Sequence, residues 1–396
     1  MHLTEGMYND GGQFTDGPPA TTIPAEWLNA VQNEIANVIE QAGLALRTSD
    51  TDSMDQLWQA IRPLQRYDIV VNNQTLFESL FERNAANDYQ IKGDYKSIFV
   101  KQIPGGSYYN VARILSGGDT WGDIKTNQCT LLKFEPGAKW NFGALAGHLE
   151  VNTDDADLDN VEITGTGVAG AIVDSFLLNA YRVTFSKCKA SNRNSNVDMV
   201  GFQGSGVALH NITSKYRDCV AYTLDGSGNV YGFESCMNFS NCVAYDLDSS
   251  GDSARGFSNC NQVSVCVAYD IEGNDNTVGF YSCSQINSCW AEKIDNNALN
   301  NAAGFWGCNQ ISGCYANDID ALNGAGGNAL GFTDCDQISA CRADDIDSIA
   351  GQANGFANCN YGSALYTAEA ANAGNTFMCS LDAQIVNKES TPQVWT

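Results

Sequence analysis

The sequence predicts a mainly β protein built as a solenoid of short, stacked parallel strands. The first observation is a repeat between residues 201 and 370. Its frame is Gly-Phe, a Cys three residues after the Phe, an aliphatic residue, a second Cys, an Ala, and an aliphatic residue followed by an acid. The copies begin at Gly201, Gly232, Gly256, Gly279, Gly304, Gly331 and Gly355. Most copies lie roughly 23 to 27 residues apart, a period typical of stacked-repeat architectures.

The second observation is that each copy holds only short apolar runs, broken by Gly, Asn, Asp and Ser. No run keeps a helical period for three turns, so the runs are predicted to be strands. One copy cannot bury a core alone, and the copies must therefore stack, with equivalent residues about 4.8 Å apart. We expect the residues of the frame to face inward. The polar segment before each Gly-Phe, such as Glu272 to Val278, should be an exposed loop.

The repeat resembles the right-handed parallel β-helices of the pectin-lyase-like kind, as the run from Gly256-Phe257 through Cys260 and Cys266 to Asp270-Ile271-Glu272 illustrates. The resemblance implies a right-handed parallel β-helix, and the residues before the repeat predict a small α-helical N-terminal region ahead of it. Four regions are expected along the chain. They are a helical attachment region at 1–66, a mixed connecting or capping region at 67–127, the β-helix at 128–385 and a C-terminal tail at 386–396.

Two amphipathic helices are expected before the repeat. The first starts near Pro24 and stops at Gly43, consistent with the usual positions of Pro and Gly at helix ends. Its apolar stripe holds Trp27, Val31, Ile35 and Val38. Together with a second helix at about 53–62, this run is similar to the N-terminal segment of many bacteriophage tail-fibre proteins. The resemblance implies attachment to phage baseplate or tail proteins and a homotrimer. The alternative is a helical hairpin that caps the solenoid locally.

The composition excludes several classes of partner. A net charge of −25 and a pI of about 4.2 argue against nucleic acid and against an anionic membrane surface. No apolar run reaches the ~18 residues of a membrane span, and the first residues do not resemble a signal peptide. We therefore expect a protein made in a cytoplasm, without membrane insertion, and the resemblance to tail-fibre proteins implies a bacterial host and a place in the virion tail.

Fifteen cysteines invite three interpretations. Stacking turns the pairs with a common internal spacing into two internal columns. Those pairs are Cys236/Cys242, Cys260/Cys266, Cys283/Cys289, Cys308/Cys314 and Cys335/Cys341. Buried free thiols act as small apolar residues. Disulfides between coils stay open, since a ~4.8 Å step lies within the permitted Cα range. Metal clusters are disfavoured because Cys-x2-Cys spacing is absent and the chain has three His.

An acid follows the last aliphatic residue of most copies, so stacking aligns a column of carboxylates. Its members are Asp225, Asp248, Glu272, Asp295, Asp320 and Asp347. Each could start a loop and accept hydrogen bonds from backbone N–H groups. The column could also bind calcium, the one cofactor left open. In a glycosidase, Asp248, Glu272, Asp295 and Asp320 would be the catalytic candidates, although any repeated acid produces such spacings.

Aromatic side chains recur at three repeat positions. Tyr222, Tyr245 and Tyr269 share one, Trp290 and Tyr315 a second, and Tyr281 and Trp306 a third. Beside carboxylates and amides, such rings can bind sugar; they could equally stack on one another or be buried in a trimer. Glycan-binding candidates are Tyr222, Tyr245, Tyr269, Trp290, Trp306 and Tyr315.

The two resemblances together indicate a phage tail fibre or tailspike that attaches to host surface polysaccharide through a rigid trimeric body. Three weak sites on one body would gain avidity. The fold also hosts enzymes, so a depolymerase is the alternative, and a baseplate or collar protein without host contact is a third. No Gly-x-Ser-x-Gly, phosphate-loop or His-Glu-x-x-His motif is present.

Overall fold

The computed structural model describes residues 9–10, 13–14 and 67–368, the last range with gaps at 85–88, 94, 104–107, 115–122, 166–167, 170–172, 206–212, 299, 322–325, 350, 361–362 and 364. The expected N-terminal helices, with Trp27, Val31, Ile35 and Val38, lie outside the described residues, and so does the tail at 386–396. No helix among the described residues is long and apolar enough to span a membrane.

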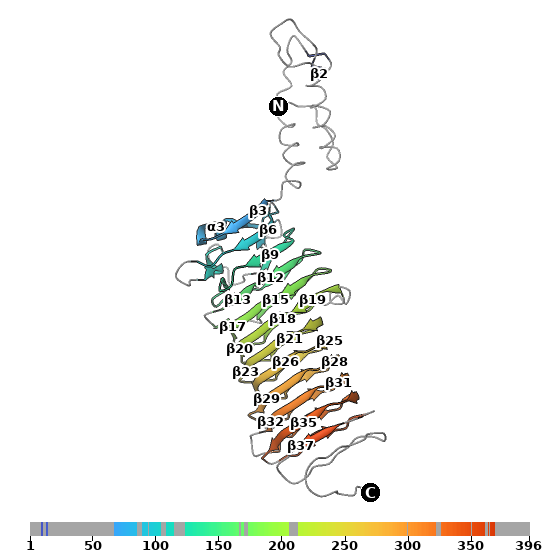
Figure 1. The fold of residues 1–396 in the computed structure, drawn as a ribbon. Helices are drawn as coiled ribbons and strands as arrows, with labels where there is room; N and C mark the ends of the chain where they lie inside the picture. Colours follow the sequence, from blue (N-terminus) through green and yellow to red (C-terminus); the bar gives the residue numbers. More distant parts are fainter. Residues whose placement is uncertain are drawn as a thin grey trace, which may run out of the picture. The chain divides into compact units, whose positions relative to one another are not determined.

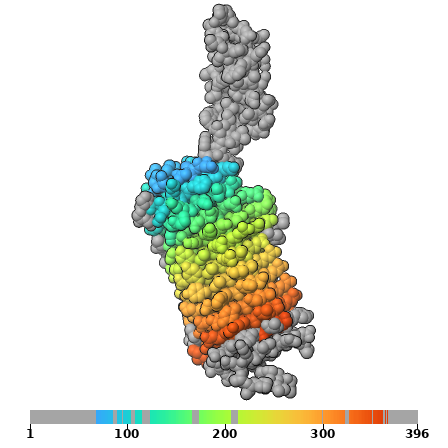
Figure 2. Space-filling model, viewed as in Figure 1, coloured from blue at the N-terminus to red at the C-terminus, as the bar shows by residue number. Residues whose placement is uncertain are grey.

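The described part from residue 67 onward is a parallel β-helix, which confirms the predicted mainly β solenoid (Figure 1). Each coil contributes one strand to each of three long sheets. Figure 2 shows the coils following one another in chain order as layers of the stack. Two short elements precede the regular coils. They are α3 (Gln74–Ser79), capped by the Asn73 side chain, and the 3-10 turn η1 (Val111–Arg113). Separately, β1 (Asn9–Asp10) pairs antiparallel with β2 (Gln13–Phe14).

The first sheet carries the Gly-Phe of the frame. Its strands are β4 (Phe81–Arg83), β5 (Tyr89–Ile91), β8 (Ile124–Lys125), β11 (Leu149–Val151), β15 (Val173–Leu178), β18 (Met199–Gln203), β21 (Val230–Glu234), β24 (Ala254–Ser258), β27 (Thr277–Tyr281), β30 (Ala302–Trp306), β33 (Ala329–Thr333) and β36 (Ala353–Ala357). All pairs in it are parallel except that of β4 with β5.

The second sheet lies between the two Cys columns. Its strands are β3 (Tyr67–Val71), β6 (Tyr95–Val100), β9 (Leu131–Phe134), β12 (Asp157–Asp159), β16 (Thr184–Ser186), β19 (Lys215–Arg217), β22 (Met237–Ser240), β25 (Asn261–Ser264), β28 (Ser284–Asn287), β31 (Asn309–Ser312) and β34 (Asp336–Ser339).

The third sheet follows the second Cys and has the longest strands. They are β7 (Tyr109–Asn110), β10 (Trp140–Asn141), β13 (Glu162–Thr164), β17 (Lys189–Ser195) with β14 (Val168–Ala169) beside it, β20 (Val220–Gly226), β23 (Val243–Ser249), β26 (Val267–Gly273), β29 (Trp290–Asn296), β32 (Tyr315–Ala321), β35 (Arg342–Ser348) and β37 (Tyr366–Ala368). Residues 67–127, expected to connect or cap, thus already supply strands to all three sheets.

A column of stacked phenylalanines runs through the core. Neighbouring rings from β15 to β36 are 4.6–4.9 Å apart and nearly parallel. The column consists of Phe176, Phe202, Phe233, Phe257, Phe280, Phe305, Phe332 and Phe356. The other frame residues are also buried, as Ile286, Ala291 and Ile294 show in one coil. Parallel register places identical side chains above one another, and this is why the frame repeats so strictly.

The glycine before each Phe is fixed by a close approach across the coil. A Cβ on Gly304 would lie 2.7 Å from the Cβ of Ala316 and 2.8 Å from the carbonyl O of Gly331. The same contact joins Gly256 to Ala268. The Gly and the Ala of the frame are therefore steric partners that bring the first and third sheets together.

The corners on either side of the second sheet use the left-handed backbone region. The residue before each column cysteine has a φ near +50° to +60°, for example Ser282 before Cys283 and Gly307 before Cys308. The turn points the following thiol inward. The Sγ of Cys308 donates to the carbonyl O of Phe280 in the preceding coil (3.2 Å), a contact repeated along this column.

All cysteines among the described residues are buried and free, fourteen in number. Burial raises the pKa of the Cys236 thiol and that of the Cys129 thiol to about 12. The described part of the chain therefore uses them as small apolar residues, as the first of the three interpretations expects.

Candidate functional site

The outer face of the third sheet carries an aromatic run. Tyr222, Tyr245 and Tyr269 occupy one register position on β20, β23 and β26. The first two rings are stacked at 5.2 Å, and the next pair is tilted at 6.0 Å. On β29 and β32 the run moves two residues toward the strand start, to Trp290 and Tyr315, whose rings lie 5.3 Å apart. Five successive strands thus present an aromatic ring on one face.

Exposure along the run is highest in the middle. Tyr269 is 39% and Trp290 is 43% exposed, among the most exposed large apolar side chains of the described chain. At the start, the hydroxyl of Tyr222 donates to Glu162 (3.3 Å), which Lys139 also contacts at 2.6 Å. These contacts hold the first ring in place and leave the middle of the run open.

The far end of the run is held by charged groups. The hydroxyl of Tyr315 donates to Asp344 (2.9 Å), Arg342 pairs with Asp344, and the Arg342 guanidinium lies 5.4 Å from the Tyr315 ring centre. Burial raises the pKa of Tyr315 to about 12, and the bond to Asp344 adds to this rise. The run therefore ends in a fixed polar cluster.

Acids form a column beside the aromatic run, as predicted. Asp225, Asp248, Glu272, Asp295, Asp320 and Asp347 are paired in register from β20 to β35. Burial and then the neighbouring acids raise the pKa of Asp295 and that of Asp320 to about 6. The pKa of Asp248 is raised for the same reasons, burial first.

A second line of charged side chains runs beside this column. Its acids, including Asp270 and Asp318, stand at a left-handed position of the same strands. Lys293 shares that position and pairs with Asp270. Among the described residues, no group of three or more His, Cys, Asp or Glu is arranged to hold a metal ion.

The first sheet has a different outer face. Trp306 and Tyr281 share one register position there, with ring centres 6.3 Å apart. The guanidinium of Arg255 lies 3.8 Å from the Tyr281 ring centre and 5.6 Å from that of Tyr231. Buried Val278, Ala303 and Leu330 form an apolar cluster against which Tyr281 and Trp306 pack. Trp306 thus belongs to a site separate from the other five glycan-binding candidates.

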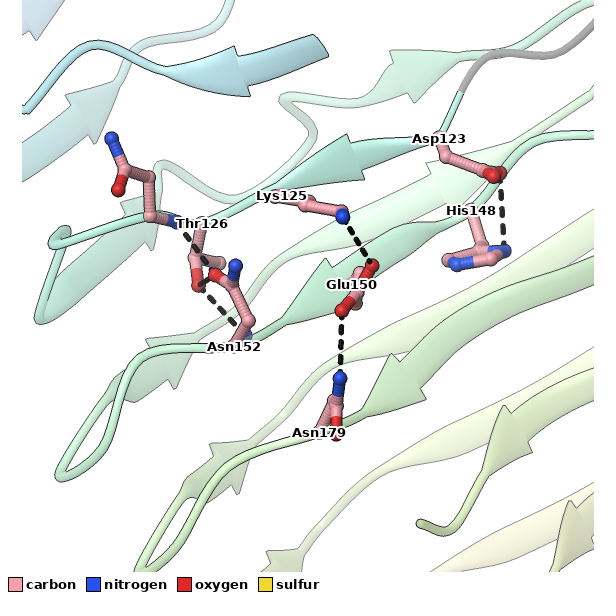
Figure 3. A network of polar contacts seen from close by, with 8 residues as sticks. Asp123, Lys125, Thr126, His148, Glu150, Asn152 and Asn179 are labelled. Atoms are coloured by element: carbon pink, nitrogen blue, oxygen red, sulfur yellow. Dashed lines mark hydrogen bonds and ion pairs between the residues drawn. The ribbon is translucent and has the colours of Figure 1, made fainter. Parts of the chain in front are cut away.

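A polar group near the start of the first sheet was missed by sequence reasoning (Figure 3). His148 Nδ1 lies 3.3 Å from Asp123 Oδ1, one coil away. Glu150 faces Lys125 at 3.7 Å and accepts from Asn179 at 2.9 Å. The sequence does not pair His148 with any residue, because these coils are irregular and give no repeat register. Only the fold brings it to Asp123.

Asp174 lies on the outer face of the next coil, in β15. Burial raises its pKa; among nearby charges, His148 opposes and Asp123 supports the rise. Burial likewise raises the pKa of Glu234, and Asp174 raises it further while Arg255 opposes. Each of these two acids therefore has both acidic and basic neighbours.

Arg193 approaches the same region from inside the coil. Its side chain is fully buried, its Nη2 donates to the carbonyl O of Gly147 (2.8 Å), and its guanidinium lies 5.0 Å from the Phe142 ring centre. Burial lowers the pKa of Arg193 to about 9, and Asp174 opposes this. Its Nη1 has no hydrogen-bond partner.

Comparisons with protein-family models, curated proteins and solved structures found no match.

Proposed function

We propose that this chain is a glycan-binding fibre of the phage tail-fibre or tailspike kind, which attaches a virion tail to host surface polysaccharide. The observation that carries the proposal is the aromatic run on five successive third-sheet strands. From Tyr222 to Tyr315 it extends about 19 Å, four coil steps of about 4.8 Å. A sugar chain laid along the sheet axis would meet a new ring at each step.

Stacking of sugar faces on rings and hydrogen bonds to side-chain oxygens would share the binding. The carboxylates of the acids beside the run would accept hydrogen bonds from sugar hydroxyl groups. The homotrimer and the attachment to other tail proteins are part of the same proposal. Their support is the resemblance of the N-terminal segment.

The proposal is tested with single alanine variants of the most exposed rings. Tyr269→Ala and Trp290→Ala should each weaken retention on the bound polysaccharide by about tenfold, the equivalent of roughly 1.4 kcal/mol. Tyr108→Ala is the matched control, because Tyr108 is 42% exposed but lies outside the run. Equal retention of all three variants would refute a role for the run.

The depolymerase is kept as a second candidate because of Asp174 and Glu234. Both stand on the outer face of the first sheet, two coils apart, and burial raises the pKa of each. Glycoside hydrolysis uses an acid with a raised pKa together with a second carboxyl group. In this candidate the catalytic residues are not Asp248, Glu272, Asp295 and Asp320.

The second candidate predicts new reducing ends when polysaccharide is incubated with the chain. Asp174→Asn should abolish their release, whereas Asp295→Asn should not. Release that survives Asp174→Asn and Glu234→Gln would exclude this pair. If the chain neither bound nor cleaved glycans from several hosts, both candidate functions would fail and a baseplate or collar role would remain.

A further inference from the structure

We propose that Arg255, with Tyr281 and Trp306, forms a subsite on the first sheet for a sugar that carries a carboxylate. The proposal rests on the proposed function, since its ligand is part of the surface glycan. It names the chemical class of that glycan: a chain with isolated acidic sugars.

Arg255 differs from the other basic residues of the regular coils in its ion-pair partners. Between residues 218 and 368 the sequence has three basic side chains, Arg255, Lys293 and Arg342. Lys293 pairs with Asp270, and Arg342 pairs with Asp344. Arg255 makes no ion pair within the described part of the chain, and its buried Nε has no hydrogen-bond partner. A cation without a carboxylate partner is unexpected in so acidic a solenoid.

Register explains what surrounds Arg255. Tyr231 and Val278 are its neighbours in the coils before and after, at the same position of the sheet. Tyr281 lies three residues beyond Val278 on the same outer face. The guanidinium carbon of Arg255 lies over the Tyr281 ring, 3.8 Å from the ring centre. Burial raises the pKa of Glu234 of the preceding coil and Arg255 opposes this rise, but the two side chains form no ion pair within the described part of the chain. The guanidinium is thus held in a fixed orientation by rings rather than by an acid.

This arrangement suits a carboxylate next to a sugar ring. A guanidinium stacked on an aromatic face keeps its edge donors for a planar, bidentate acceptor. Trp306, one coil further, supplies a ring on which the neighbouring sugar can lie. The apolar cluster of Val278, Ala303 and Leu330 lies against Tyr281 and Trp306 and fixes both rings. The net negative charge elsewhere favours a glycan with sparse acids over a uniformly anionic polymer.

The test compares two ligands that differ in one group. The probes are an oligosaccharide that contains glucuronic acid and the same oligosaccharide after reduction of its carboxyl groups to glucose. Titration calorimetry with the full chain should give tighter binding of the acidic probe by tenfold or more. Arg255→Gln keeps a planar side chain over Tyr281 and should remove this preference, while Arg255→Lys should restore part of it. Binding of the acidic probe should also weaken with salt.

Lys293→Gln is the matched control, since it removes a basic residue that already has a partner. It should leave the preference unchanged. Equal binding of both probes by the unchanged chain, or an equal loss of both in Arg255→Gln, would overturn the subsite and leave the proposed function intact. Failure of the unchanged chain to bind either probe or any host glycan would overturn both.

Discussion

Val265 occupies a corner position that a β-branched residue disfavours. Its φ is +54°, and its side chain is 52% exposed. The equivalent corners hold Asn241, Ser288, Gly313 and Ala340. A left-handed conformation costs an ordinary residue roughly 1–2 kcal/mol, and Asn adopts it more readily. Loss of the half-buried Val surface costs about 0.7 kcal/mol. Val265→Asn should therefore stabilise the protein by about 0.5–1 kcal/mol.

The assay is the thermal midpoint at one scan rate, followed by circular dichroism. A gain of about 1 °C is expected for Val265→Asn. Val267→Asn, two residues later on the regular part of β26, is the control: the same exchange there removes a strand former without relieving strain, so it should lower the midpoint. If both variants shifted the midpoint downward by similar amounts, the corner would not be strained and the reasoning would fail.

Three further predictions follow from the core, the acids and the thiols. Gly304→Ala should destabilise the chain by about 1–3 kcal/mol in denaturant titrations, because the new Cβ would overlap Ala316. Gly307→Asn, at an open left-handed corner, is the control and should cost far less. Similar losses in both variants would contradict the steric pairing. Asp295 and Asp320 have raised pKa values of about 6, so their contribution to stability is complete below about pH 4 and is lost as the pH rises through 6. The double Asn variant should thus be about 1 kcal/mol more stable than the natural chain at pH 7 and no more stable at pH 4, and a pH-independent difference would refute this. The Cys379→Ser variant keeps the fourteen described thiols. Ellman's reagent should label none of these thiols in the folded variant and all of them after unfolding. Rapid labelling of the folded variant would disprove their burial.

The regular coils could be predicted from sequence because stacking imposes one environment on every copy. The Phe column and the Gly–Ala contact require the same residue in each coil, so Phe280 and Ala291 repeat and reveal their inward orientation. The two Cys columns follow from the same constraint. The acidic and aromatic columns were also predictable, since register alone aligns their members.

The outer face of the first sheet was largely hidden from sequence reasoning. Its residues differ from coil to coil because solvent-facing positions do not have to repeat. Arg255 and Tyr281 are 26 positions apart and meet only by a diagonal contact between neighbouring coils. His148 and Asp123 belong to irregular coils, where no period sets the register. The repeat position shared by Tyr281 and Trp306 was the signal that the sequence offered for this face, and it did not include Arg255.

The most direct test of the account is incubation of the purified chain with capsular polysaccharide and lipopolysaccharide fractions from several bacterial hosts. Retention on the glycan and new reducing ends are both measured, with Trp290→Ala beside the natural chain. The account predicts retention by the natural chain that falls about tenfold in the variant. Equal retention by both, or no retention on any fraction, would contradict glycan binding along the aromatic run.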